Sequence, residues 1–455
     1  MTSTLTRPAH RHVTADVRQG VRVRRPLPVW WISPVGAVLL VVPLSLLVAD
    51  RIPDLDYRIF YRTPKVLTHA DTLLFLAAAG VLVLGLLVPV VARASQPAAT
   101  WPALSPPARR VLARGETVAF WLTVTGYVLL GVIGLARGAT PAVLYAAVVS
   151  GDNYTGQLKT LFAPVAGITS LTQVGIAYVV VAGTLLSTGF SARLVRRIAI
   201  VVLLGLARAY LLTERLAVLE LLVPLLAIGA FRVRQRARHG GWVGAVPVVA
   251  VPALLVVFGA FEYSRSWVFF RDRTTLSFPQ FVVNRLAGYY ATSYNNGSLQ
   301  LAHPAEGRLP FDSIQAFWTA PGISQLNLYE RLSHQGGSDL LNTVLAQYGN
   351  PEFNNPGGLA TPFIDFGTVG GLVFFLLCGL VVGTAYSGWR SGRPVGLLLY
   401  PVLFTGLLEL PRYVYWTQGR IVPAVVVLLV LAHLVHRATP RPLRVSAPVG
   451  AGVAP

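Results

Sequence analysis

Residues 354–386 read NNPGGLATPFIDFGTVGGLVFFLLCGLVVGTAY, and in them a polar, turn-rich segment passes directly into a long apolar run. A run of about 20 apolar residues crosses a bilayer as a helix, because each backbone amide is then hydrogen-bonded inside the segment. The polar side of this boundary closes a long insert, 262–367, that separates two groups of apolar segments. The stretch therefore predicts a membrane-embedded helical bundle that carries one large loop.

The composition of the whole chain agrees with this prediction. The 455 residues are 54% hydrophobic and only 12% charged, with a mean hydropathy of +0.60, which excludes an ordinary water-soluble domain. We expect an all-α polytopic membrane protein with about ten transmembrane helices. The expected spans are residues 29–49, 72–91, 117–135, 171–189, 198–212, 216–231, 242–261, 368–386, 395–408 and 421–434. The fifth and sixth are short and could instead form one broken or re-entrant pair.

Arginine gathers in alternate connectors, as the preference of basic residues for cytoplasmic loops predicts for ten spans. The clusters lie at residues 22–25, 109–114, 193–197, 232–238, 390–393 and 437–444. We therefore expect a cytoplasmic basic tail at 1–28, spans 1–7 within 29–261, an external loop at 262–367, spans 8–10 within 368–434 and a cytoplasmic tail at 435–455. Much of the net charge of +20 then comes from the basic residues that set the membrane topology, and nucleic-acid binding is not needed to explain it.

A few charged residues lie at membrane depth, where ionisable groups are costly and often functional. Arg208, Glu214, Arg215 and Glu220 stand between two apolar runs. One interpretation is a packing ion pair, Arg208 with Glu214 or Glu220 with a neighbour. The other uses the planar fork of arginine, which binds phosphate oxygens in pairs, and assigns Arg208 and Arg215 to a pyrophosphate headgroup.

Two external segments carry further candidate binding residues. In 409–420, Arg412 and Arg420 stand among aromatic residues, and the structural alternative is an aromatic belt at the membrane interface. The insert contributes side chains suited to a carbohydrate, namely Arg285, Tyr289, Tyr290, Asn295, Asn296, Asn354 and Asn355. The structural alternative is that the asparagine and glycine residues of this segment form turns. Short amphipathic helices are expected at 277–286 and 340–348.

The chain resembles the O-antigen polymerase family, the oligosaccharide repeat-unit polymerases of bacterial polysaccharide assembly. The residues that carry the resemblance are 167–173, Arg208 with 213–217, Gly288-Tyr289-Tyr290 with Asn295-Asn296, and Asp365-Phe366-Gly367 before Gly370-Gly371. The resemblance implies a glycosyltransferase-C-like architecture in the bacterial cytoplasmic membrane. It also implies transfer of a glycan from polyprenyl pyrophosphate to a lipid-linked repeat unit at the outer face, in O-antigen, capsule or exopolysaccharide synthesis. Expected partners are the polyprenyl-pyrophosphate-linked oligosaccharide, membrane lipid, and possible chain-length regulator and flippase proteins.

Such a reaction needs cations for the pyrophosphate leaving group and a base for the acceptor hydroxyl. Arg208, Arg215, Arg412 and Arg420 are the candidates for the first role. Asp365, before the eighth span, is the leading candidate base, although it could instead cap that helix. Glu214, His303, His334 and Glu352 are the other candidates for the base. No cofactor or metal ligand is expected, and the single cysteine, Cys378, lies in an apolar span.

Three other functions compete with polymerisation. An O-antigen ligase shares the topology and leaving group and differs in its acceptor. A transferase that uses polyprenyl-monophosphate sugars would place an acidic site at Asp54-Leu55-Asp56. A flippase or exporter of lipid-linked glycan would carry polar groups through the full membrane depth, whereas here they gather toward one face.

Overall fold

The computed structural model describes residues 29–93, 101–102, 104–150, 152–165, 167–212, 214, 216–236, 240–274, 276–304, 308–334, 336 and 339–439. Within these ranges every regular element is a helix and none is a strand. The all-α fold class expected from the sequence is therefore confirmed.

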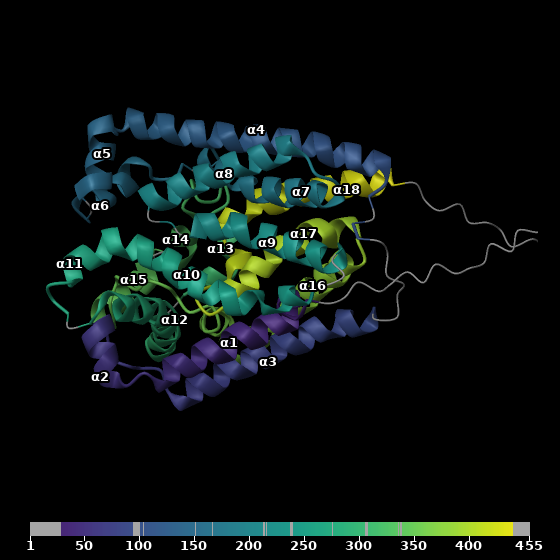
Figure 1. The fold of residues 1–455 in the computed structure, drawn as a ribbon. Helices are drawn as coiled ribbons and strands as arrows, with labels where there is room; N and C mark the ends of the chain where they lie inside the picture. Colours follow the sequence, from purple (N-terminus) through teal and green to yellow (C-terminus); the bar gives the residue numbers. More distant parts are fainter. Residues whose placement is uncertain are drawn as a thin grey trace, which may run out of the picture.

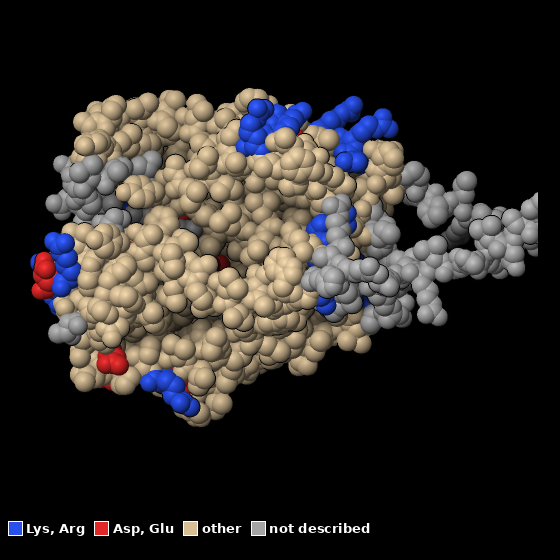
Figure 2. Space-filling model, viewed as in Figure 1, with Lys and Arg blue, Asp and Glu red and all other residues tan. Residues whose placement is uncertain are grey.

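Eight of the described helices are long and apolar enough to cross a membrane. They are α1 (Pro34–Arg51), α3 (His69–Ala92), α4 (Pro106–Ala136), η3 (Thr169–Gln173) with α7 (Val174–Thr188), α9 (Leu216–Arg236), η4 (Gly240–Ala245) with α10 (Val246–Glu262), α16 (Thr361–Arg390), and η8 (Gly419–Ile421) with α18 (Val422–Ala438). The long helices lie side by side (Figure 1). Figure 2 shows a broad uncharged band across the same face. The chain is a multi-pass membrane protein.

The two remaining predicted spans form helices of a different character. Helix α17 (Pro394–Glu409) is apolar but has only 16 residues, and it packs against α16, α18 and α9. Helix α8 (Ala192–Leu211) has 20 residues but carries four arginines along its length. The fifth and sixth predicted spans correspond to the helices α8 and α9, which a short link joins.

Helix α7 forms the centre of the bundle. It packs against α4, α9, α17 and α18, and nearly every one of its side chains is buried. Small residues bring other helices close together, since association in lipid depends on tight packing. A Cβ atom on Gly85 of α3 would lie 2.5 Å from the carbonyl oxygen of Leu376 in α16. The absence of a side chain at Gly85 thus allows the backbones of α3 and α16 to come into contact.

The insert contributes a set of mostly short helices between α10 and α16. These are η5 (Tyr263–Trp267), α11 (Val268–Phe270), α12 (Phe278–Ala302), η6 (Asp312–Ile314), α13 (Gln315–Trp318), α14 (Leu328–Ser333) and α15 (Asp339–Tyr348). In Figure 1, α11, α12 and α15 gather at one end of the bundle, with α2 (Asp54–Asp56), α5 (Pro141–Ser150) and α6 (Asp152–Leu161).

The expected short helices in the insert meet two different outcomes. The helix expected at 340–348 is confirmed as α15. The short helix expected at 277–286 is wrong in length, because the same residues begin the 25-residue helix α12. Helix α12 packs against α1 and α10, and its buried Phe281, Ala291 and Tyr294 make it part of the protein interior.

Helix α16 begins earlier than the sequence predicts. It starts at Thr361, and its course is interrupted at Gly367, whose φ of 70° and ψ of -179° are not helical. A positive φ favours glycine. The expected start of the eighth span at residue 368 therefore coincides with the start of the second of two helical parts of α16, which meet at this kink.

Candidate functional site

The link between α8 and α9 places a carboxylate beside an arginine at the end of α8. Glu214 Oε2 accepts hydrogen bonds from Arg208 Nε at 3.1 Å and from Nη2 at 2.7 Å. Arg208 Nη1 also donates to Thr172 Oγ1 of η3 at 2.9 Å. The packing pair considered from the sequence is therefore present, and Arg208 has a second anchor on a neighbouring element.

The loop after α17 holds Arg412 from several sides. Its guanidinium donates to Glu409 Oε2 at 2.8 Å and to Asn355 Oδ1 at 3.2 Å. The same group lies 5.6 Å from the ring centre of Tyr289 and 5.3 Å from that of Tyr413. Two carboxamide or carboxylate acceptors and two aromatic rings therefore fix the guanidinium in one orientation.

Two glycines bring the end of the insert onto this loop. Gly357 has a φ of +84°, and its backbone N–H donates to the carbonyl of Arg412 at 3.0 Å. A Cβ atom on Gly358 would lie 2.2 Å from the carbonyl oxygen of Leu410. Gly357-Gly358 thus forms a tightly packed turn beside Arg412. This agrees with the interpretation that the glycines in this segment form turns.

Arg420, at the start of α18, pairs with Glu220 of α9. Arg420 Nε lies 2.8 Å from Glu220 Oε1, and Nη2 donates to Oε2 at 2.9 Å. The Nη2 contact is a hydrogen bond and the Nε contact is an ion pair without hydrogen-bond geometry. The pair ties the start of the last span to α9.

These elements enclose a cavity of about 380 Å³. It is lined by Glu214, Leu216, Tyr289, Asn354, Arg412, Tyr413, Gln418 and Arg420. Glu214, Tyr289, Asn354, Arg412 and Arg420 are candidates from the sequence, and the fold brings them together from four separate segments. The candidates from the sequence do not include Leu216, Tyr413 and Gln418, although Gln418 stands between Arg412 and Arg420 in the chain and its side chain can donate and accept hydrogen bonds.

The charge states of the loop groups follow from their surroundings. Burial alone would lower the pKa of Arg412, but Glu409 and the surrounding tyrosines raise it above its ordinary value. Burial raises the pKa of Tyr413 well above its usual range. The cavity therefore presents a permanent cation beside a neutral phenol.

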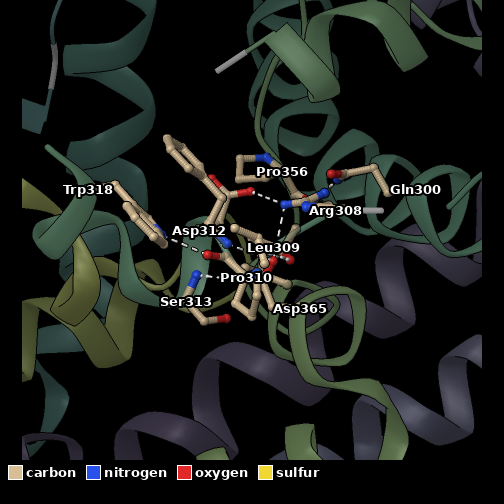
Figure 3. A network of polar contacts seen from close by, with 12 residues as sticks. Gln300, Arg308, Leu309, Pro310, Asp312, Ser313, Trp318, Pro356 and Asp365 are labelled. Carbon is tan, nitrogen blue, oxygen red and sulfur yellow. Dashed lines mark hydrogen bonds and ion pairs between the residues drawn. The ribbon is translucent and has the colours of Figure 1, made fainter. Parts of the chain in front are cut away.

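Asp365 does not line this cavity. Its carboxylate is fully buried and accepts hydrogen bonds from the backbone N–H groups of Phe311 and Ser313 at 3.2 and 2.7 Å. Arg308 Nη2 lies 3.2 Å from Asp365 and 2.9 Å from Asp312 (Figure 3). The carboxylate oxygens of Asp365 therefore contact groups of the insert, and the helix that follows the kink at Gly367 begins after Asp365. Asp365 anchors the 308–313 segment of the insert to α16.

Two predicted sugar-binding residues, Asn295 and Asn296, bind backbone groups. Asn295 Oδ1 accepts from the N–H groups of Val66 and Leu67 at 2.6 and 3.1 Å. Asn296 Nδ2 donates to the carbonyls of Phe353 and Asn355 at 2.6 and 3.0 Å. Both asparagines are buried. They attach α12 to neighbouring loops, and the structure gives them no place in the cavity lining.

Tyr290 and Arg285, also on α12, lie outside the cavity lining. Burial raises the pKa of Tyr290 to about 12. Arg285 Nη2 donates to Glu352 at 2.6 Å, and its Nε lies 3.7 Å from Glu262. Arg285 thus belongs to a separate ion-pair cluster, although Glu352 is one of the alternative bases considered from the sequence.

The remaining candidates are dispersed. His303 stacks on Tyr348 with ring centres 3.8 Å apart, and His334 ends α14 with a φ of 55°. Asp54 accepts from Arg58 Nε at 2.7 Å, a contact that chiefly accounts for the lowered pKa of that exposed carboxylate. Arg215 lies outside the described residues. Among the residues that the structure describes, no group of three or more His, Cys, Asp or Glu side chains has the arrangement of a metal site.

The chain was compared with protein-family models, with curated proteins and with solved structures, and none of the three comparisons finds a match.

Proposed function

We propose that the protein polymerises lipid-linked oligosaccharide repeat units at the outer face of a bacterial cytoplasmic membrane. The observation that supports this most is the single cavity in which Arg412 and Arg420, a carboxylate at Glu214, and the aromatic and amide side chains of Tyr289 and Asn354 meet. Such a cavity offers cations for a pyrophosphate, a base for a hydroxyl, and stacking and hydrogen-bonding groups for a sugar.

The position of the cavity is consistent with an outward opening. Tyr289 and Asn354 come from the insert, which directly precedes α16. After the kink at Gly367, residues 368–390 of α16 form a helix about 35 Å long, so Arg390 at the end of α16 lies far from the insert. Basic residues favour the cytoplasmic side. We therefore propose ten spans, counting α8 and α17, with both termini cytoplasmic, the insert outside, and a glycosyltransferase-C-like arrangement.

The proposed reaction needs one bond to form and one to break at the donor sugar. A hydroxyl of the acceptor repeat unit attacks the anomeric carbon of the donor glycan and forms a glycosidic bond. The bond from this carbon to the pyrophosphate oxygen breaks, and its electron pair leaves with the polyprenyl pyrophosphate. Arg412 and Arg420 stabilise the negative charge on the leaving group. Glu214 accepts the hydroxyl proton.

Glu214 replaces Asp365 as our proposed base because of its surroundings. A general base has to come within hydrogen-bonding distance of the proton that it removes. Glu214 lines the cavity, whereas Asp365 is fully buried beside Arg308. The proposal therefore assigns Asp365 a structural role.

The test is the glycan made by a strain that lacks the gene, complemented with wild type, Arg412→Ala, Glu214→Gln or Asp54→Ala at matched membrane levels. Deletion should leave single repeat units on the lipid carrier. Wild type and Asp54→Ala should restore a ladder of chain lengths, and the other two variants should not. Long unligated chains in the deletion strain would instead indicate a ligase. An altered sugar composition would indicate a single-sugar transferase, and an unchanged glycan would exclude all three.

A further inference from the structure

Three arginines around the cavity are each paired with a glutamate, and the three pairs differ in how firmly the glutamate is held. Arg420 pairs with Glu220, Arg412 with Glu409, and Arg208 with Glu214. We propose that the Arg208–Glu214 pair is exchangeable: a phosphate oxygen of the lipid diphosphate replaces Glu214 on Arg208, and the released carboxylate becomes the base. This inference rests on the proposed function and adds an order of events to it.

Glu214 is less buried than the other two glutamates. The side chain of Glu214 is 32% exposed, against 2% for Glu220 and 8% for Glu409. Separating a buried pair leaves an uncompensated charge in a dry environment, whereas a partly solvated carboxylate can return to water. Glu214 is therefore the partner that an incoming anion displaces most easily.

The geometry of the pair favours departure of the glutamate and retention of the arginine. Both hydrogen bonds from Arg208 reach the same oxygen, Oε2 of Glu214, so one side-chain rotation breaks both. Arg208 keeps its bond to Thr172 Oγ1 at 2.9 Å. Glu214 belongs to the short link between α8 and α9, and the rotation needs no movement of either helix.

Access to Arg208 also depends on Glu214. Glu214 belongs to the cavity lining, while the side chain of Arg208 is only 8% exposed. In the unliganded arrangement Glu214 thus occupies the phosphate-binding fork of Arg208. A diphosphate that enters the cavity gains a third cation only by displacing this carboxylate.

The exchange has a chemical consequence for the base. While Oε2 of Glu214 accepts two hydrogen bonds from Arg208, this oxygen is not available to an acceptor hydroxyl. Once phosphate occupies Arg208, the oxygen is released and can accept the hydroxyl proton. The base thus becomes effective after the donor has bound, when an acceptor hydroxyl can use it.

Binding of a short polyprenyl diphosphate tests the exchange. Farnesyl diphosphate would be titrated into the purified full-length protein in nanodiscs, with wild type, Glu214→Gln and Glu352→Gln compared. Glu352 is the matched control, because it is also 32% exposed and pairs with an arginine, Arg285, outside the cavity lining. Removal of the competing charge should make Glu214→Gln bind about tenfold more tightly than wild type, with Glu352→Gln unchanged.

A second substitution ties the gain to Arg208. Adding Arg208→Lys to Glu214→Gln should abolish the tenfold gain, because lysine lacks the planar fork. If Glu214→Gln binds no more tightly than wild type while wild type binds well, the exchange is wrong and the proposed function stands. If no variant binds the diphosphate, the carrier chemistry of the proposed function fails, and the exchange fails with it.

Discussion

The carboxylate of Asp365 accepts the backbone N–H of Ser313 at 2.7 Å, and this contact links the start of α16 to the part of the insert nearest the cavity loop. The carbonyl of Asp312, the preceding residue, accepts a hydrogen bond from Thr417 Oγ1 at 2.9 Å. Thr417 directly precedes Gln418, which lines the cavity. Asp365 therefore supports the shape of the cavity from behind it.

Replacing Asp365 should affect stability before chemistry. In Asp365→Asn the buried Arg308 loses one of its two carboxylate partners, and we expect the free energy of unfolding to fall by about 2–3 kcal/mol. The measurement is thermal unfolding of the detergent-purified protein. Asp54→Asn, in an exposed pair, should leave the melting temperature close to that of the wild type. If the Asp365→Asn protein is as stable as the wild type but has no polymerase activity, the structural role is wrong and Asp365 is a catalytic residue.

The same cluster should make stability depend on pH. Burial raises the pKa of Asp312 from 3.8 to about 6, against the opposing effect of Arg308. Because the folded state binds this proton more tightly, the contribution is present below about pH 4 and is lost as the pH rises through about 6, with a size of about 1–2 kcal/mol. Melting temperatures measured from pH 4.5 to 7.5 should show this fall. Asp312→Asn should flatten the profile, and an unchanged slope would contradict the assignment.

Gly358→Ala should disturb the loop that carries Arg412. The added Cβ atom would meet the carbonyl oxygen of Leu410 at 2.2 Å, and overpacking of this kind costs about 1–3 kcal/mol. We expect lower stability and a loss of long glycan chains. Gly80→Ala is the control, since its Cβ atom would meet nothing within 4 Å and alanine favours a helix. Equal effects of the two substitutions would rule out the packing explanation.

The loop after α17 shows what the sequence can and cannot predict. Hydropathy predicts the eight long apolar helices, because each span must satisfy its own backbone and needs a minimum apolar length. Arg208 and Glu214 are identifiable because charges at membrane depth are costly, and Arg412 and Arg420 because they stand among aromatic residues in an external segment. Glu409 is a local partner of Arg412, three residues before it, whereas the pairing of Arg420 with Glu220 depends on how α18 and α9 pack, and no local pattern contains that information.

Asn295 and Asp365 illustrate the opposite error. Both are polar residues in a chemically rich segment, and both use their side chains on backbone N–H groups. A large insert has many backbone groups outside regular helices, and buried ones need partners. Sequence patterns do not distinguish a polar side chain that serves this purpose from one that faces a ligand, whereas the cavity lining does.

Arg412→Lys should reduce polymerisation strongly while leaving the fold intact. Lysine keeps the charge but cannot contact Glu409 and Asn355 together or stack between Tyr289 and Tyr413. We expect the rate of oligomer formation to fall by about 10²-fold at equal expression. Arg285→Lys, in the separate cluster with Glu352, should retain most of the activity. A similar loss in both variants would mean that Arg412 has no special role.

The most direct test of the central claim is reconstitution of the purified protein in liposomes with the polyprenyl-pyrophosphate-linked repeat unit of its source organism as the sole substrate. The account predicts lipid-linked products of two and more repeat units, with one free polyprenyl pyrophosphate released for each new glycosidic bond. It also predicts that Glu214→Gln gives neither product. If wild-type protein leaves the single repeat unit unchanged, or if Glu214→Gln forms oligomers at the wild-type rate, the proposed function or the proposed base, respectively, is wrong.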